Sequence, residues 1–344
     1  MRTRFELIRE LAPSIEPFRF RQIDQALFAP ECDGWNNISS LPYEMRELIA
    51  TVQWMSLSLE TMRKSASNDT YKALLKLEDG LLIESVLMRN ARGSWTVCAS
   101  SQVGCAMGCA FCATGRMGLK RNLTSDEITD QLRFWLYFLF KNPEIGGRIS
   151  NVVMMGMGEP LANYDNLKYA MNKWLAYTEL GHTNITVSSV GFLPRLEQML
   201  SDMEFPHIRM AISLHSAIPE TRKAIVPTSF DDFLPKLADW SKRYLAKFGN
   251  RRHHLTFEYV MLSGINDNNT DAIALAKYVN GIGNVRVNLI PYNFTDMGFE
   301  KSVNERVIKF QKTLERRGVI ATRRRPMGDD ISAACGQLAV KKTS

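Results

Sequence analysis

The sequence predicts an α/β protein whose main part is a partial barrel of six βα units, (β/α)6, in the manner of a (β/α)8 fold. From residue 95 onward, short runs rich in β-branched and apolar residues alternate with helical patterns, which is typical of a parallel sheet. The 344 residues, of which 45% are hydrophobic, allow one large α/β domain or two ordinary ones. Residues that carry chemistry follow several of these runs directly, as they do in parallel barrels.

Two accessory segments precede the barrel. Residues 1–70 read mostly as helices separated by prolines, and we expect a small helical domain there. The pair Asp79-Gly80 separates two β-rich runs, which predicts a β-hairpin extension over residues 71–94. Glu84 lies within the second arm of this hairpin and on its apolar face, where a carboxylate is unusual. The predicted domains are therefore 1–70, 71–94 and 95–344, and the last includes a C-terminal tail.

Six strands and two helix starts define the predicted barrel. Capping-box patterns at Thr124-Ser125-Asp126-Glu127 and at Ser302-Val303-Asn304-Glu305 predict the beginnings of two helices. The strands are predicted over Trp95–Ser100, Arg148–Met155, Asn184–Ser189, Ile208–Leu214, Leu255–Leu262 and Val285–Ile290.

Composition and charge restrict the class of protein. The first 17 residues carry charges throughout, and the longest apolar run, 134–140, is too short to span a bilayer. We therefore expect a cytoplasmic protein without a membrane partner. The net charge of +7 favours a polyanionic partner, although clusters of basic residues are also common on solvated faces. These clusters are Arg251-Arg252-His253-His254, Arg316-Arg317 and Arg323-Arg324-Arg325.

Small and polar residues gather at the ends of the predicted strands. Because the carboxyl ends of parallel strands form one rim of a barrel, we expect these residues to line a common site. They are Gly156-Met157-Gly158-Glu159-Pro160 after the second strand, Ser188-Ser189 in the third, Ser213-Leu214-His215-Ser216 around the end of the fourth, and Pro291-Tyr292-Asn293 after the sixth.

Three of the six cysteines, Cys105, Cys109 and Cys112, lie close together after the first predicted strand. A cluster of this kind is not the pattern of a secreted disulfide framework. A structural zinc site needs four ligands, and no histidine occurs before His182. Three thiolates instead suit an iron–sulfur cluster in which one iron stays free to bind a substrate.

The spacing Cys-x3-Cys-x2-Cys, with Phe111 before the last cysteine, resembles the signature of radical S-adenosylmethionine (SAM) enzymes. From about residue 18 to residue 340, the chain is similar to the RlmN/Cfr family of radical SAM RNA methyltransferases. The segments that carry this resemblance are TVCASSQVGCAMGCAFCATGRMGLKRNLTSDEI, GMGEPLANYDN, SLHSA, LIPYN and GDDISAACGQL.

The resemblance implies a set of cofactors and the residues that hold them. The three clustered cysteines would bind one [4Fe-4S] cluster, whose open iron would chelate SAM. Two molecules of SAM would be consumed in each turnover. The residues that match SAM-binding positions of the family are Gly158, Glu159, Ser188, Ser213, Leu214, His215 and Asn293.

The resemblance also implies the reaction, methylation of C2 of an adenine in 23S ribosomal RNA and in transfer RNAs. This carbon is too electron-poor to attack a methyl sulfonium directly, so the methyl group would first be placed on Cys335. A radical formed from a second SAM would activate that methyl group for addition to the base. Glu84 matches the general base that removes the C2 proton. Cys98 matches the thiol that releases the product by forming a disulfide with Cys335.

The expected partners, and the functions that stay open as alternatives, are as follows. We expect 23S ribosomal RNA and transfer RNA as substrates, RNA contacts from the helical domain and the basic clusters, flavodoxin or ferredoxin as electron donor, and a monomeric protein. Methylation of adenine C8, as in the Cfr branch, stays open, although Pro160 suits the C2 branch better. A non-catalytic RNA-binding protein stabilised by a metal also stays open. A radical activase that acts on a protein would leave Glu84, Cys98 and Cys335 without a role.

Overall fold

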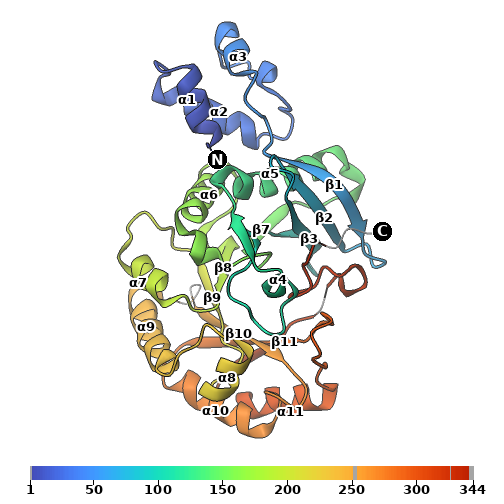
Figure 1. Cartoon of the computed structure of the whole chain (residues 1–344), viewed down its shortest axis with the longest axis vertical. Coiled ribbons are helices and arrows are strands. Elements are labelled where there is room, and N and C mark those ends of the chain that lie inside the picture. The colour runs from blue at the N-terminus through green and yellow to red at the C-terminus, as the bar shows by residue number, and fades with distance from the viewer. Residues whose placement is uncertain (1, 251–253, 326, 341–344) are drawn as a thin grey trace.

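The computed structural model describes residues 2–250, 254–325 and 327–340 (Figure 1). Ten strands form one sheet in the order β1-β2-β3-β4-β7-β8-β9-β10-β11-β12. From β4 onward, neighbouring strands of this sheet run parallel, which confirms the predicted α/β barrel-like class. The parallel strands are β4 (Trp95–Cys98), β7 (Ile149–Met154), β8 (Ile185–Ser189), β9 (Arg209–Ser213), β10 (Leu255–Met261), β11 (Val285–Pro291) and β12 (Ile320–Arg323).

Strand β12 is a seventh parallel strand that the sequence analysis did not predict. Only Ala321 of its four residues is buried, so the strand lacks the apolar pattern that identifies a core strand. It pairs with β11 and forms one edge of the sheet, and it connects α11 to the C-terminal tail.

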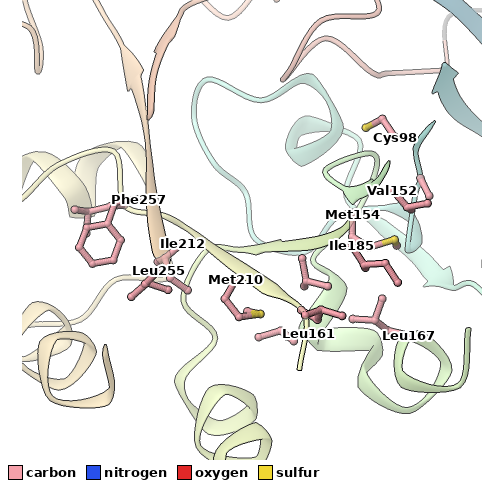
Figure 2. Close-up of a cluster of buried hydrophobic side chains, with 14 of the residues drawn as sticks. Cys98, Val152, Met154, Leu161, Leu167, Ile185, Met210, Ile212, Leu255 and Phe257 are labelled. Carbon is pink, nitrogen blue, oxygen red and sulfur yellow. The ribbon is translucent and has the colours of Figure 1, made fainter. Parts of the chain in front are cut away.

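Helices cover the outer face of the parallel sheet, and their apolar sides join the strands in one hydrophobic cluster. Figure 2 shows part of this cluster, in which side chains of β7 to β10 such as Met154, Ile185 and Phe257 lie with Leu167 of α6. The helices are α5 (Ser125–Lys141), α6 (Tyr164–Tyr177), α7 (Leu193–Ser201), α9 (Phe233–Phe248), α10 (Asn269–Asn280) and α11 (Asn304–Glu315). The short helix α8 (Pro219–Ile225) packs instead in a separate apolar cluster with Cys109.

One of the two predicted capping boxes is present. At the start of α5, the Thr124 hydroxyl accepts the Glu127 N–H, and the Glu127 carboxylate accepts the Thr124 N–H. The second box was wrong, because α11 begins at Asn304 after Val303 and has no side-chain cap. The preceding Lys301 pairs with Leu262 in a β-bridge, and the Ser302 side chain is buried instead of reaching the helix end.

The N-terminal helices lie at one end of the molecule and have an apolar cluster of their own (Figure 1). They are α1 (Arg4–Leu11), α2 (Pro17–Phe28) and α3 (Tyr43–Ile49). The buried carboxylate of Asp130 on α5 pairs with Arg4 of α1, at 2.6 Å, and with Arg133. This network fastens the helices to the barrel. No helix in the described part of the chain is long and apolar enough to cross a membrane.

An antiparallel extension joins the N-terminal helices to the barrel. The predicted hairpin is formed by β2 (Thr70–Leu77) and β3 (Leu82–Arg89), and β3 pairs with β4. The expectation of mostly helical structure up to residue 70 was wrong at β1 (Leu57–Lys64), which pairs with β2. This strand lies at the sheet edge and most of its residues face solvent, so its sequence carries little apolar signal. The three predicted domain limits stay a prediction.

Candidate active site

The cysteine loop follows β4 and is framed by the short hairpin of β5 (Gln102–Gly104) and β6 (Leu119–Asn122). Gly104 has φ +78, and a Cβ atom there would lie 1.8 Å from the carbonyl oxygen of Gly118, so only glycine fits this close approach. The Cys105 N–H donates to that same carbonyl oxygen at 3.2 Å. The Ala110 N–H donates to Ile225 O of α8 at 2.9 Å, which anchors the other side of the loop.

The three cysteines of this loop are free thiols that influence one another electrostatically. Burial raises the pKa of Cys105 to about 11, and burial also raises the pKa of Cys109 and Cys112. Three thiols with raised pKa values become thiolates at neutral pH only if a cation takes the place of their protons.

The donor set of the loop fits an iron–sulfur cluster better than a single metal ion. Within the described residues, no three His, Cys, Asp or Glu side chains are arranged to hold one ion. In a cubane cluster each thiolate binds a different iron, so its sulfur ligands lie farther apart than the ligands of one ion. An all-thiol set from one loop is also the soft ligand set that iron–sulfur clusters use.

A pocket opens beside the loop at the carboxyl ends of the strands. It brings together five of the predicted SAM-binding residues, Gly158, Glu159, Ser188, Ser213 and His215, and Cys112 also lines it. The other two predicted residues lie outside its lining. Leu214 is completely buried, and its N–H donates to Glu258 O; Asn293 lines the adjacent pocket.

Glu159 is held in place by backbone donors at the edge of this pocket. Its carboxylate oxygens accept the N–H of Leu161 at 3.0 Å and of Val190 at 2.9 Å. Burial raises the pKa of Glu159 to about 7. Gly158 has φ +100, and a Cβ atom there would collide with Gln102, whose side-chain oxygen accepts the Glu159 N–H. The site therefore presents a fixed, poorly solvated carboxylate that would favour a cationic group of a ligand.

His215 reaches the pocket through an unusual backbone conformation, with φ +59. Its Nδ1 accepts the Val260 N–H at 3.1 Å, so the other ring nitrogen carries the proton of the neutral form. Burial, together with the nearby Arg222, lowers the pKa of His215 to about 3. The ring therefore acts as a neutral hydrogen-bond donor, and the edge-to-face contact with Phe111 ties it to the cysteine loop.

A second pocket adjoins the first and contains the two isolated cysteines. Cys98 at the end of β4 and Cys335 in the tail both line it, and Cys335 lines the cofactor pocket as well. Burial, and to a lesser extent Cys335, raises the pKa of Cys98 to about 12. Both cysteines are free thiols, so the expected disulfide between them is not present.

Glu84 is not brought into either of these pockets. It lines a third pocket, in which its carboxylate lies 3.0 Å from Lys72 Nζ and accepts the Ala339 N–H at 2.9 Å. The tail segment that carries Cys335 is therefore also the cover of Glu84. In this arrangement, Cys98 and Cys335 share one pocket, and Glu84 lies in another that the tail covers.

Hydrogen bonds fasten the tail at Cys335 and directly after it. The Ala113 N–H donates to Gly336 O at 2.9 Å, and the Thr114 hydroxyl donates to Leu338 O at 2.5 Å. The Asn293 amide donates to Cys335 O at 3.1 Å. Cys335 is therefore positioned by contacts with the cysteine loop and with the end of β11.

Two functional candidates, Glu258 and Arg324, were missed at the sequence level as members of the site. Glu258 lies on β10 inside the barrel, and its Oε2 is buried without a hydrogen-bond partner among the described residues. Arg324, which the sequence analysis placed among RNA contacts, follows β12 and lines both adjoining pockets. Its Nη1 lies 3.9 Å from Glu258 Oε2. The available signal for Glu258 was a carboxylate within an apolar strand.

The remaining arginines of the basic clusters differ in whether the structure describes them. Arg316, Arg317, Arg323 and Arg325 are exposed, as an RNA contact or a solvated face requires. Residues 251–253 of the first cluster lie outside the described residues.

Comparisons with known proteins agree with this geometry. The sequence model of the Radical SAM superfamily matches residues 100–276, which include the cysteine loop and most of the pocket. The dual-specificity RNA methyltransferase RlmN of Anaeromyxobacter sp. (strain Fw109-5) is 38% identical over 330 residues, 94% of this chain and 85% of that protein. The chain belongs to the RlmN family of radical SAM RNA methyltransferases.

Two further proteins are similar to this chain. The ribosomal RNA large subunit methyltransferase N of Nitrosopumilus maritimus is 37% identical and covers 88% of this chain and 87% of its own. A radical SAM methyltransferase from Sphaerobacter thermophilus has the same fold, with a TM-score of 0.88 and 35% identity over 98% of this chain and 97% of that chain. As a family member, the protein is an RNA methyltransferase, and the family implies a [4Fe-4S] cluster and SAM.

Proposed function

We propose that this RlmN-family enzyme methylates C2 of an adenine in 23S ribosomal RNA and in transfer RNAs. The observation that carries the proposal is the pair Cys98 and Cys335, which come from opposite ends of the barrel sequence and line one pocket beside the cofactor pocket. A thiol that carries the methyl group and a second thiol that releases it must be able to meet. The names of the relatives, an RNA methyltransferase of dual specificity and a ribosomal RNA methyltransferase, support the substrates.

In this proposal the cluster is held by Cys105, Cys109 and Cys112, and SAM lies in the pocket beside it. When bound, the two together supply the methyl group and the radical that activates it. Glu159 would accept hydrogen bonds from the cationic end of SAM. Ser188, Ser213 and the neutral His215 would bind its other polar groups, while Leu214 and Asn293 would support them through the strand ends.

Cys335, Glu84 and Cys98 would carry out the remaining steps of the reaction. Cys335 holds the methyl carbon and carries it into a covalent bond with the adenine. Glu84 then accepts the proton that leaves C2, which requires the tail to move away from its present hydrogen bond with Glu84. The Cys98 thiolate attacks the Cys335 sulfur, and the carbon–sulfur bond to the RNA adduct breaks with its electron pair going to the carbon. That carbon takes up a proton from solvent to become the methyl group, and the methylated base leaves. The two cysteines end as a disulfide that an external reductant must reopen.

The partners follow from this chemistry. We propose flavodoxin or ferredoxin as the source of the electron that the cluster needs, and a monomeric, cytoplasmic enzyme. The N-terminal helices and the exposed arginines Arg316, Arg317, Arg323 and Arg325 would contact RNA phosphates, which supply much of the affinity for nucleic acid.

The position of the methyl group tests the proposal. Purified enzyme is incubated anaerobically with unmodified 23S ribosomal RNA or transfer RNA, SAM and a reductant, and the nucleosides are analysed by mass spectrometry. We expect 2-methyladenosine from the wild type and from Cys32→Ala, and none from Cys335→Ala. The appearance of 8-methyladenosine would assign the enzyme to C8 methylation, and unmodified RNA with a fully loaded enzyme would exclude both reactions.

A further inference from the structure

Arg222 of α8 is a buried cation beside the cysteine loop to which the proposed reaction gives no role. Its side chain is only 1% exposed. Its guanidinium donates to Leu214 O at 3.1 Å, to Val190 O at 2.7 Å, to Ser213 O at 3.4 Å and to the Ser229 hydroxyl. All of these acceptors are neutral.

No carboxylate among the described residues forms an ion pair with Arg222. Arg133, which is also fully buried, shows the usual arrangement, because its charge is paired with that of Asp130. Arg222 is compensated instead by the ring of Phe233, whose centroid lies 3.8 Å from the guanidinium carbon. Burial lowers the pKa of Arg222 to about 10, so the side chain is still charged at neutral pH.

The charge of Arg222 acts on the cysteine loop. Cys109 packs in one apolar cluster with Ile225 and Val226. Ile225 is the last residue of α8 and Val226 is its C-cap, about one turn after Arg222. The Ala110 N–H donates to Ile225 O at 2.9 Å, so helix and loop are held together. The positive charge of Arg222 favours the thiolate form of Cys109 and so lowers its pKa. The Cys109 thiolate in turn raises the pKa of Arg222.

Arg222 does not reach the cofactor pocket itself. It is absent from the residues that line that pocket, and its donors are directed at the carbonyls of β9 and of the segments after β8 and β9. A bound ligand therefore cannot be its partner without breaking these contacts. What remains is its electrostatic field, which is weakly screened because both the guanidinium and Cys109 are buried.

We propose that Arg222 is a fixed positive charge that favours the reduced state of the iron–sulfur cluster held by Cys105, Cys109 and Cys112. Three thiolates make such a site anionic, and each electron that enters adds a further negative charge. A buried cation lowers the free energy of the reduced form more than that of the oxidised form. Removal of the charge therefore shifts the reduction potential to a more negative value. The proposal rests on the cluster site of the proposed function.

Ser229 allows the charge to be tested without removal of Arg222. Its hydroxyl accepts from Arg222 Nη1 and donates to Val226 O at 2.8 Å, outside the cofactor pocket. Ser229→Asp places a carboxylate against the guanidinium, and Ser229→Asn places a neutral side chain of nearly the same shape there. Arg222→Gln removes the charge directly, and Arg222→Lys keeps it with fewer hydrogen bonds.

The readout is the midpoint potential of the cluster, followed by electron paramagnetic resonance during an anaerobic redox titration. Iron and sulfide content are measured on every sample. We expect Arg222→Gln and Ser229→Asp to shift the potential to more negative values, while Ser229→Asn and Arg222→Lys stay close to the wild type. If Arg222 only holds the strand ends in place, all four substitutions should alter stability. The midpoint potential would then not depend on the charges at residues 222 and 229.

The outcomes separate this proposal from the cluster assignment. A fully loaded Ser229→Asp variant with the potential of Ser229→Asn overturns the role of Arg222 and leaves the cluster site intact. A wild-type protein that binds no iron or sulfide overturns both. If Arg222→Gln does not fold, the comparison of the two Ser229 variants still decides the question.

Discussion

The carboxylate of Glu84 and the ammonium of Lys72 lie 3.0 Å apart, and their side chains are only 5% and 9% exposed. The two residues belong to the neighbouring strands β3 and β2, and the tail covers them through the bond from the Ala339 N–H. The proposed base is therefore one member of a buried ion pair. The tail must move before Glu84 can contact a substrate.

This ion pair predicts a large difference between two lysines on the same strand. Lys72→Met leaves the Glu84 charge buried without its cationic partner, so we expect a loss of about 3 kcal/mol in the free energy of unfolding. Lys76→Met, at an exposed position of β2, should change it by less than about 0.5 kcal/mol. Urea denaturation measures both. Equal effects of the two substitutions would show that the pair is solvated in solution.

The cysteine loop predicts the cofactor content. Anaerobically purified protein should be brown and contain about four irons and four sulfides per chain. The variant with Cys105, Cys109 and Cys112 all replaced by alanine should contain neither, while Cys32→Ala, in the N-terminal apolar cluster, should keep both. Iron and sulfide assays check this result. A triple variant that retains the cluster would move the site elsewhere in the chain.

Substitutions of Cys335 and Cys98 should have different effects, because in the proposed mechanism Cys335 carries the methyl carbon and Cys98 releases the product. Cys335→Ala should give neither an RNA adduct nor methylated RNA. Cys98→Ala should accumulate RNA covalently bound to Cys335, because no thiolate remains to attack its sulfur. Mass spectrometry of the denatured protein, with and without nuclease, detects the adduct.

Glu84→Gln should also accumulate this adduct, because the C2 proton then stays in place. Normal turnover of Cys98→Ala without bound RNA would contradict the proposed mechanism.

The arginines after β12 should differ in their contribution to RNA binding. Arg323 and Arg325 are exposed, whereas Arg324 lies inside the barrel near Glu258. If the first two contact phosphates of a single-stranded segment, each alanine substitution should reduce the log–log salt slope of binding by about 0.7. Arg324→Ala should leave the slope unchanged. Filter-binding titrations at several salt concentrations measure it, and unchanged slopes for Arg323→Ala and Arg325→Ala would identify a solvated face.

Glu159 predicts a pH dependence of stability in the protein without cofactors. Burial raises its pKa from 4.5 to about 7, so the folded state holds this proton more tightly than the unfolded state. The stabilisation of about 3 kcal/mol is fully present below the unfolded pKa and is lost as the pH rises through about 7. Unfolding free energies at about pH 5 and about pH 8 should therefore differ more in the wild type than in Glu159→Gln.

Glu197→Gln, which replaces an exposed carboxylate on α7, is the matched control for this measurement. It should keep the wild-type pH dependence. A Glu159→Gln variant with the same dependence as the wild type would show that Glu159 ionises normally.

Local patterns in the sequence were enough for the class of fold and for the cysteine loop. Alternating apolar and helical runs predicted the parallel strands from β4 to β11, because the interior of a parallel sheet selects for continuous apolar segments. The Asp79-Gly80 turn and the Thr124 capping box are set by contacts within a few residues, and both are present. The edge strands β1 and β12 were missed, since solvent-facing edges impose little pattern on their residues.

The sequence by itself therefore determined the elements whose signals are local: the core strands, the hairpin, the three clustered cysteines and the polar strand ends. Only the tertiary structure decided which distant residues meet. In the structure, Cys98 and Cys335 line one pocket, and the tail covers Glu84. Arg324, which the sequence predicted to lie in a surface cluster, lies beside Glu258. These contacts depend on how the sheet curves and where the tail is fastened, and no short stretch of residues encodes either property.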